Sequence, residues 1–227
     1  MVDSAAGAGR RRKPLEKEQL SRDAWLDAAA NAIAEGGFDN VRVLVLAKKL
    51  GVTRGSFYWH FKDHEDLVVS FLQRWRQRRL AELANWRPTG HDIEQELHRI
   101  MHLLLSESSR HLWRMRVELA VRDLARRDAL AAQVVAEVDQ ARIEQNAQLL
   151  ASIANDPSGA ADLALLLYVA TMGAQLVTTG PLGDTDVVGR IERLIANLVL
   201  DWHKRGGGDL LPTEAGSTVA GRGRADG

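Results

Sequence analysis

One short segment near the N-terminal end limits the possible fold more than any other part of this sequence. Leu46 and Leu50 are four residues apart, so they lie on one face of a short helix. Gly51 follows them, and glycine most readily takes the left-handed conformation in which helices end. Phe57 and Phe61 are again one helical turn apart and can be buried together. The segment therefore predicts two short helices that meet at a glycine turn, which is a helix-turn-helix.

The rest of the chain carries apolar residues at helical spacing, interrupted by glycine, proline and polar runs. We predict helices over residues 21–36, 39–50, 53–61, 63–86, 92–106, 112–125, 128–153, 160–179 and 184–204. Thr53 can cap the third helix and Asp63 the fourth, because their side-chain oxygens accept bonds from free N–H groups. The sequence shows no convincing strand pattern and no internal repeat. It therefore predicts an all-α fold of about nine helices, with a small N-terminal domain and a larger helical domain.

The composition excludes several classes of protein. The absence of cysteine excludes a disulfide framework, an iron–sulfur cluster and a thiol nucleophile. The longest apolar stretch, residues 163–169, is shorter than the roughly eighteen residues that a membrane span needs. The basic run at residues 10–13 is not followed by the apolar segment of a secretory signal. The common nucleophile and phosphate-binding motifs of enzymes are absent too. We expect a soluble cytoplasmic protein that is not an enzyme, uses no cofactor and has no membrane partner.

Charge is distributed unevenly although the formal net charge is zero. Residues 1–62 contain eleven Lys or Arg against seven Asp or Glu, whereas the rest contains nineteen against twenty-three. A basic first part is what binding to phosphate groups requires. Ordinary scatter of charge explains the same difference, so the charge pattern alone does not decide between the two.

Residues 51–62 read GVTRGSFYWHFK, and this run closely resembles the DNA-binding signature of TetR-family (tetracycline-repressor-like) transcriptional regulators. The family pattern is roughly G-V-[ST]-x-[GP]-[ST]-[LF]-Y-x-H-F-x-[SD]-K-E-x-L. Arg42 stands where the family often has a capping threonine, so we expect Asn40 to cap that helix instead. His64 stands where the family has a lysine, which weakens one expected phosphate contact near neutral pH.

The resemblance implies that the second helix of the motif enters the major groove of double-stranded DNA. Arg54 is expected to read a base, because a guanidinium can bond both major-groove acceptors of guanine. Gly55 lets the backbone approach closely, and Lys62 takes the phosphate-binding position of the family. The predicted DNA-binding residues are Thr53, Arg54, Gly55, Ser56, Tyr58, Trp59, His60 and Lys62.

Three of these residues have structural alternatives. Tyr58 could be a core residue with its hydroxyl at the rim, Trp59 could pack on the first helix, and His60 could cap a carbonyl group. Phe57 and Phe61 we assign to the core.

One short helix is too small to find a site in a genome, so the resemblance also implies a homodimer that reads a palindrome. We expect the last two helices to form its interface. The residues predicted to pack across the two-fold axis are Leu166, Val169, Gly173, Leu176, Ile191, Ile195 and Leu198. The alternative is that this stripe is the core of the domain itself, and both can hold, since obligate interfaces resemble a core cut in half.

The larger domain of the family usually encloses a pocket for a small-molecule effector. A mainly apolar wall with a few polar groups would suit a hydrophobic or aromatic compound. The predicted pocket residues are Trp75, Met101, Leu104, Trp113, Met115, Glu118, Tyr168, Met172 and Gln175. The alternative is that Trp and Met residues at helical spacing simply fill the core.

Together these expectations describe a dimeric, sequence-specific repressor that a small effector releases from a palindromic operator. The expected layout is a disordered basic arm (1–20), a DNA-binding domain (21–64), an effector-binding and dimerisation domain (65–205) and a disordered tail (206–227). One alternative is a helical interaction module whose helix-turn-helix no longer binds DNA. Another is a metal-responsive regulator that uses His98 and His102, which are four residues apart, with His91 and Glu94 nearby.

Overall fold

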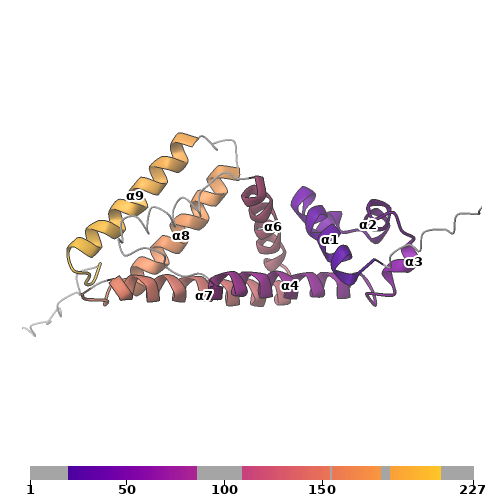
Figure 1. The fold of residues 1–227 in the computed structure, drawn as a ribbon, viewed down its shortest axis with the longest axis horizontal. Coiled ribbons are helices and arrows are strands. Elements are labelled where there is room, and N and C mark those ends of the chain that lie inside the picture. The colour runs from indigo at the N-terminus through magenta and orange to yellow at the C-terminus, as the bar shows by residue number, and fades with distance from the viewer. Residues whose placement is uncertain (1–19, 86–108, 154, 180–184, 211–227) are drawn as a thin grey trace, which may run out of the picture.

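The computed structural model describes residues 20–85, 109–153, 155–179 and 185–210, and within these ranges every regular element is a helix (Figure 1). The elements are α1 (Arg22–Gly36), the 3-10 turn η1 (Phe38–Asn40), α2 (Val43–Lys49), α3 (Arg54–Phe57), α4 (His64–Asn85), α6 (Ser109–Ala125), α7 (Ala129–Ile153), α8 (Ala160–Thr179) and α9 (Thr185–Lys204). The predicted all-α fold is confirmed. The helix predicted at 92–106 lies outside the described residues.

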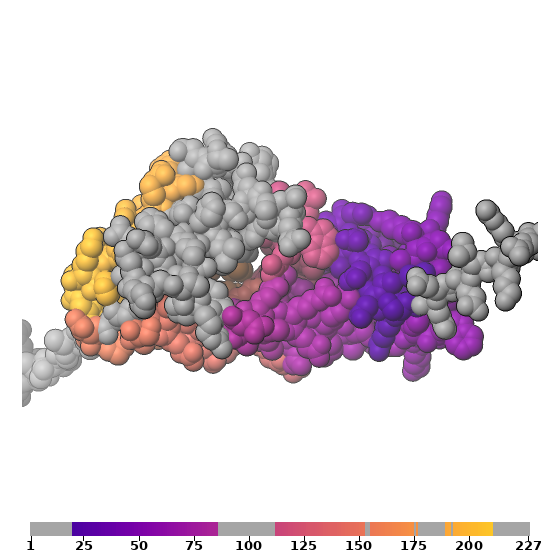
Figure 2. Space-filling model, in the orientation of Figure 1, coloured from indigo at the N-terminus to yellow at the C-terminus, as the bar shows by residue number. Residues whose placement is uncertain are grey.

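The helices form an elongated molecule. Helices α1, α2 and α3 cluster at one end, and α4 leads from this cluster into the body, where it runs alongside α7 (Figure 1). Helix α6 crosses this pair and packs against α1, while α8 packs on α7 and α9 covers α8 at the other end. In the space-filling view the indigo and purple residues of the first helices and the yellow residues of α9 occupy opposite ends (Figure 2). Two hydrophobic clusters follow this division, one joining α1–α4 to α6 and α7, and one between α7, α8 and α9.

The turn between α2 and α3 follows from Gly51, as predicted. Its φ of 68° lies in the left-handed region, which L residues rarely adopt. The Gly51 N–H donates to Lys48 O, and the Val52 N–H donates to Ala47 O. These two bonds satisfy the last carbonyl groups of α2, which is the Schellman arrangement of a helix end. The glycine turn therefore sets the direction in which α3 leaves α2.

The start of α2 differs from the prediction. Asn40 does not cap it, since it ends the 3-10 turn and α2 begins at Val43. A Cβ added at Gly36 would come within 2.8 Å of Asn40 Cγ, so the Asn40 side chain lies tightly against the end of α1. Arg42 occupies the N-cap position, but its Nε donates backwards to Asp39 O over 3.2 Å. The contact of Asn40 with Gly36 thus replaces the predicted cap.

The predicted tail is wrong at its beginning, because residues 206–210 belong to the fold. Gly206, Gly207 and Gly208 all have positive φ, between 86° and 95°. Their turn folds back so that Asp156 N–H donates to Gly206 O over 2.7 Å and Gly208 N–H donates to Asp156 O over 2.8 Å. Trp202 Nε1 also donates to Gly208 O over 2.8 Å. The end of α9 is therefore fastened to the loop between α7 and α8.

Candidate nucleic-acid interface and ligand cavities

Two phenylalanines fix the position of α3. Phe57 and Phe61 are fully buried, and their rings stack with centroids 5.3 Å apart. Phe57 also meets the buried Trp25 of α1 edge-on at 5.4 Å. This aromatic cluster anchors one side of α3 to the core, as expected, and leaves its opposite side to solvent. Helix α3 is shorter than predicted, since it ends at Phe57 and residues 58–60 form turns.

The exposed side of α3 and of the turn that follows it carries an arginine and two large aromatic residues. Tyr58 is 51% exposed and Trp59 is 81% exposed, so the structural alternatives of a core tyrosine and of a tryptophan packed on α1 are both wrong. Arg54 is exposed and donates from Nη2 to Tyr58 Oη over 2.9 Å. This bond uses one of five N–H donors of the guanidinium and holds the side chain along the helix surface. The remaining donors can bind an external acceptor.

Gly55 lies in the first turn of α3 and is exposed. Its φ is not positive, and among the described residues a Cβ added here would meet only Thr53 Oγ1 at 3.7 Å. The fold of the chain itself therefore does not require glycine at this position. Gly51, by contrast, is required by its backbone conformation. A small residue at 55 is consistent with close approach of another molecule to the backbone of α3.

The other predicted contacts lie around the same surface. Thr53 is the N-cap residue of α3, although within the described residues its side chain makes no capping bond. Ser56 and His60 are half-buried, and Lys62 is exposed. The structure therefore brings all eight predicted DNA-binding residues to one end of the molecule.

The entry to α4 is fixed by reciprocal capping. The Asp66 N–H donates to Asp63 Oδ1 and the Lys62 N–H donates to Asp66 Oδ2, both over 2.9 Å. The predicted cap at Asp63 is confirmed, and it holds Lys62 at the edge of the α3 surface. His64 has a role that the sequence did not reveal, because its Nε2 hydrogen-bonds Val41 O over 2.7 Å and joins α4 to the loop before α2.

Two apolar residues on α2 were missed. Leu44 and Val45 are exposed, although the neighbouring Leu46 is fully buried. They add exposed apolar surface on α2. The only available signal was that they fall outside the buried stripe of α2, which Leu46 and Ala47 form.

The predicted effector pocket is divided between separate places. Trp75 and Trp113 line a cavity of about 450 Å³ between α1, α4 and α6. Met115 is buried and Met172 half-buried. Met101 and Leu104 lie outside the described residues, and so does the side chain of Gln175.

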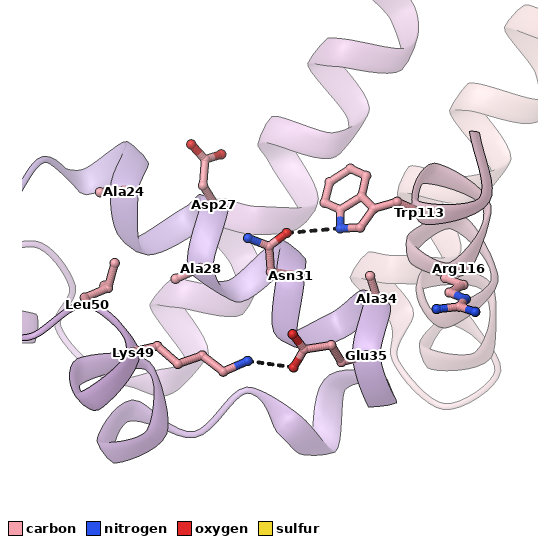
Figure 3. Close-up of a pocket in the computed structure, with 10 residues that line it drawn as sticks. All are labelled: Ala24, Asp27, Ala28, Asn31, Ala34, Glu35, Lys49, Leu50, Trp113 and Arg116. Carbon is pink, nitrogen blue, oxygen red and sulfur yellow. Dashed lines mark hydrogen bonds and ion pairs between the residues drawn. The ribbon is translucent and has the colours of Figure 1, made fainter. Parts of the chain in front are cut away.

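A second cavity, of about 670 Å³, lies between α1, the end of α2, and α6 (Figure 3). Trp113 belongs to its wall as well and donates from Nε1 to Asn31 Oδ1 over 3.0 Å. Lys49 and Glu35 form an ion pair of 2.6 Å across the same cavity. Trp113 therefore separates two hollows at the junction of the N-terminal helices with the body.

Glu118 and Tyr168 belong to a buried ionic network rather than to either cavity. Glu118 is 6% exposed and accepts two bonds from Arg142, over 2.6 and 2.9 Å. Arg122 donates to Glu118 over 2.9 Å, to Asp139 over 2.6 Å and to Tyr168 Oη over 3.2 Å. Burial alone would raise the pKa of Glu118, but the hydrogen bonds and charges of the surrounding arginines lower it to about 2. Burial and Asp139 raise the pKa of Tyr168. Glu118 is therefore a structural anion that ties α6 to α7.

The surface predicted for dimerisation is only partly exposed. Leu166, Val169, Leu176 and Leu198 are exposed, and a Cβ at Gly173 would meet nothing within 4 Å among the described residues.

Two residues of that predicted surface lie elsewhere. Ile195 is 7% exposed and belongs to the core between α7, α8 and α9, and Ile191 packs against that core. The sequence analysis missed Leu165 and Leu194, which are exposed. His91, Glu94, His98 and His102 lie outside the described residues, and the described residues contain no cluster that could hold a metal ion.

Residues 26–71 match the family model of bacterial regulatory proteins, tetR family. The chain is 41% identical over 56 residues to the HTH-type transcriptional regulator AcrR of Shigella flexneri, which covers 25% of this chain and 26% of the relative. It is 30% identical over 113 residues to the HTH-type transcriptional repressor AcnR of Corynebacterium glutamicum, covering 50% and 55%. The matches thus span between a quarter and about half of the length of these curated relatives.

The fold resembles solved structures over most of the chain. A transcriptional regulator of Rhodococcus sp. Rha1 superposes with a TM-score of 0.68 at 21% identity, covering 80% of this chain and 97% of that one. A putative transcriptional regulator of Saccharomonospora viridis, solved in complex with choline, gives 0.64 at 21% identity, covering 79% and 95%. Among the described residues, every helix is too short or too polar to cross a lipid bilayer. With the helix-turn-helix geometry, the matched N-terminal segment identifies residues 26–71 as similar to the tetR family of bacterial regulatory proteins.

Proposed function

We propose that the protein is a sequence-specific, DNA-binding transcriptional regulator whose α3 enters the major groove. The observation that carries this proposal is the exposed side of α3 and of the turn after it, which presents Arg54, Gly55, Tyr58 and the largely exposed Trp59 to solvent. Solvent-exposed aromatic residues beside an arginine are unusual on a surface without a partner, and they suit contact with a sugar-phosphate backbone. A glycine that the fold does not need would let the duplex come close.

Each exposed group then has a chemical role. Arg54 reads a base edge, because its guanidinium can bind two acceptors of guanine at once. Lys62 neutralises a phosphate at the entry to α4, and the hydroxyl of Thr53 donates to a phosphate oxygen. Release of Arg54 from Tyr58 Oη upon binding would leave that hydroxyl free for a phosphate as well.

The proposed active form is a homodimer, with the exposed apolar face of α8 and α9 as its interface. Leu165, Leu166 and Val169 of α8 are exposed, and so are Leu194 and Leu198 of α9. A contiguous patch of exposed apolar residues usually marks an interaction site. Two copies would present two α3 helices to half-sites roughly 34–36 Å apart on one face of the duplex.

We further propose that the regulator is a repressor that responds to a small molecule. Two of its curated relatives are named as repressors, and one structural neighbour was solved with a bound small molecule. Two hollows lie where the N-terminal helices meet the body, so a ligand there would contact both parts. It would change DNA affinity only by as much as it prefers one arrangement of them.

Selection of bound duplexes from random DNA tests the proposal. The expected result is a palindromic consensus whose affinity falls steeply with salt, since phosphate contacts release counterions. Arg54→Ala should cost roughly 1–3 kcal/mol and relax the preference at one position of each half-site. Arg127→Ala, at an exposed arginine just after α6, serves as a control of equal charge and should leave binding unchanged. The absence of any enriched sequence at low salt would contradict the proposal and favour an interaction module.

A further inference from the structure

The cavity between α1, α4 and α6 has an unusual lining. It contains four guanidinium groups and two indoles, and Glu82 is its only carboxylate among the described residues. The polar side chains that matter are Arg74, Trp75, Arg78, Arg79, Trp113 and Arg114. Ala30, Phe71 and Val117 add apolar surface. The cavity is therefore rich in hydrogen-bond donors and poor in acceptors.

The carboxylates around the cavity do not use all these donors. Glu82 accepts from Arg79 over 2.8 Å and also from Arg114. Asp27 binds Arg74 at 2.7 Å but lies 3.9 Å from Arg78. Asp27 is largely exposed to solvent, which weakens its interaction with both arginines. Arg78 is thus the cation with the weakest attachment to a carboxylate in this lining.

Two buried N–H donors of the lining residues also lack an acceptor in the part of the chain that the structure describes. Trp75 Nε1 and Arg79 Nε find no acceptor among the described residues, although Trp75 is 95% buried. A buried donor without a partner is costly, on the order of 1–3 kcal/mol. Burial also lowers the pKa of Arg79, because the nearby Glu82 and Glu118 do not fully compensate for lost hydration. An additional anion in the cavity would offset the burial of the Arg79 charge.

We propose that this cavity binds a small aromatic carboxylate. The carboxylate would be held by Arg78 and Arg114, since a planar guanidinium matches a carboxylate with two parallel hydrogen bonds. The ring would lie against Phe71 and the two tryptophans. A volume of about 450 Å³ falls within the range of small-molecule sites, which is roughly 300–1,000 Å³. This narrows the effector class to anions with an apolar ring.

The position of the cavity gives such a ligand a route to the DNA-binding helices. Ala30 of α1 belongs to its wall, and the adjacent Asn31 accepts the hydrogen bond from Trp113 of α6. A ligand wedged between α1 and α6 therefore changes their spacing, while α4 forms the third wall. This regulatory part rests on the proposed function, whereas the binding part does not.

Calorimetric titration with three ligands of the same ring tests the binding part. 1-Naphthoate should bind, while the neutral 1-naphthalenemethanol and the cationic 1-naphthylmethylammonium should bind at least about tenfold more weakly, because a charge-assisted bond contributes on that order. Equal binding of the alcohol, tighter binding of the cation, or no binding of naphthoate would overturn the proposal.

Three arginine variants locate the site. Arg78→Gln and Arg114→Gln should each weaken naphthoate binding by about tenfold. Arg116→Gln is the matched control, because Arg116 lies on α6 as Arg114 does but lines the neighbouring cavity (Figure 3). This variant should bind naphthoate as the unchanged protein does. Melting curves confirm that each variant is folded. Naphthoate binding that neither cavity variant weakens would refute the assignment.

DNA binding is measured separately on a selected duplex. Naphthoate should alter the affinity for this duplex in the unchanged protein and in Arg116→Gln, but much less in Arg78→Gln. If naphthoate binds without any effect on DNA affinity, the regulatory part is wrong and the site stands. If no duplex is ever bound, the proposed function is wrong, and the calorimetry still decides the ligand site.

Discussion

Alanine substitutions at Gly51 and Gly55 are expected to change the stability of the chain in opposite directions. Gly51 has a φ of 68°, and a Cβ there would meet nothing within 4 Å among the described residues. The cost is therefore conformational, roughly 1–2 kcal/mol for an L residue in the left-handed region. The smaller entropy of the unfolded alanine chain returns about 0.4–1 kcal/mol. The net expectation for Gly51→Ala is a loss of about 1 kcal/mol in the free energy of unfolding.

Gly55→Ala lowers the entropy of the unfolded chain by the same amount, but it does not force an L residue into the left-handed region. Its φ is not positive, and the new methyl group would lie at ordinary contact distance from Thr53 Oγ1. The free energy of unfolding should rise by about 0.4–1 kcal/mol. Its DNA affinity should nevertheless fall by about tenfold, because the methyl group would occupy space that we assign to the duplex.

Urea unfolding followed by circular dichroism measures both changes, and an unchanged slope shows that only stability has altered. DNA affinity is measured in parallel with a selected duplex at fixed salt. A Gly55→Ala protein that is more stable and binds DNA as tightly as before would refute the close approach at α3. A Gly51→Ala protein with unaltered stability would refute the left-handed turn.

Three further changes test other parts of the structure. Glu118→Gln should destabilise the fold by about 3–5 kcal/mol, because it leaves Arg142 buried opposite a neutral group, and thermal melting measures the loss. Since the pKa of Glu118 is about 2 in the fold and ordinarily 4.5, its stabilisation is complete above pH 4.5 and is lost as the pH falls towards 2. The slope of stability against pH in this window should therefore be smaller in Glu118→Gln. Leu194→Glu, at a residue 67% exposed, should convert the proposed dimer to a monomer in sedimentation without lowering the helix content. Gly159→Ala should loosen the end of α9, because its Cβ would overlap Gly208 O, and amide hydrogen exchange of the last turn should rise.

The helical layout could be predicted because it depends on residues close together in the sequence. Gly51 and Asp63 act on their own backbone neighbours, so their roles were visible from their positions alone. Asn40 failed as a cap although the cause is also local: its side chain packs against Gly36, four residues earlier, and periodicity does not reveal this contact.

Predictions that depended on how helices meet were less successful. Periodicity identifies a face of α9 but not its edges, so the buried Ile195 was assigned to the surface while the adjacent Leu194 was missed. The effector residues were chosen by type, and type does not distinguish a cavity wall from an ionic network. Glu118 joined the network because Arg79 of α4 and Arg142 of α7 converge on it, which no single segment of the sequence reveals.

Trp113 has a further consequence, because one indole forms part of the boundary of both hollows beside α1. Within the part of the chain that the structure describes, Trp113 donates one hydrogen bond, to Asn31, and packs against the N-terminal hydrophobic cluster. A compound that rotates the indole away from one compartment must narrow the other. Occupants of the two compartments are therefore expected to influence each other through this ring, so the affinity of each would depend on whether the other is present.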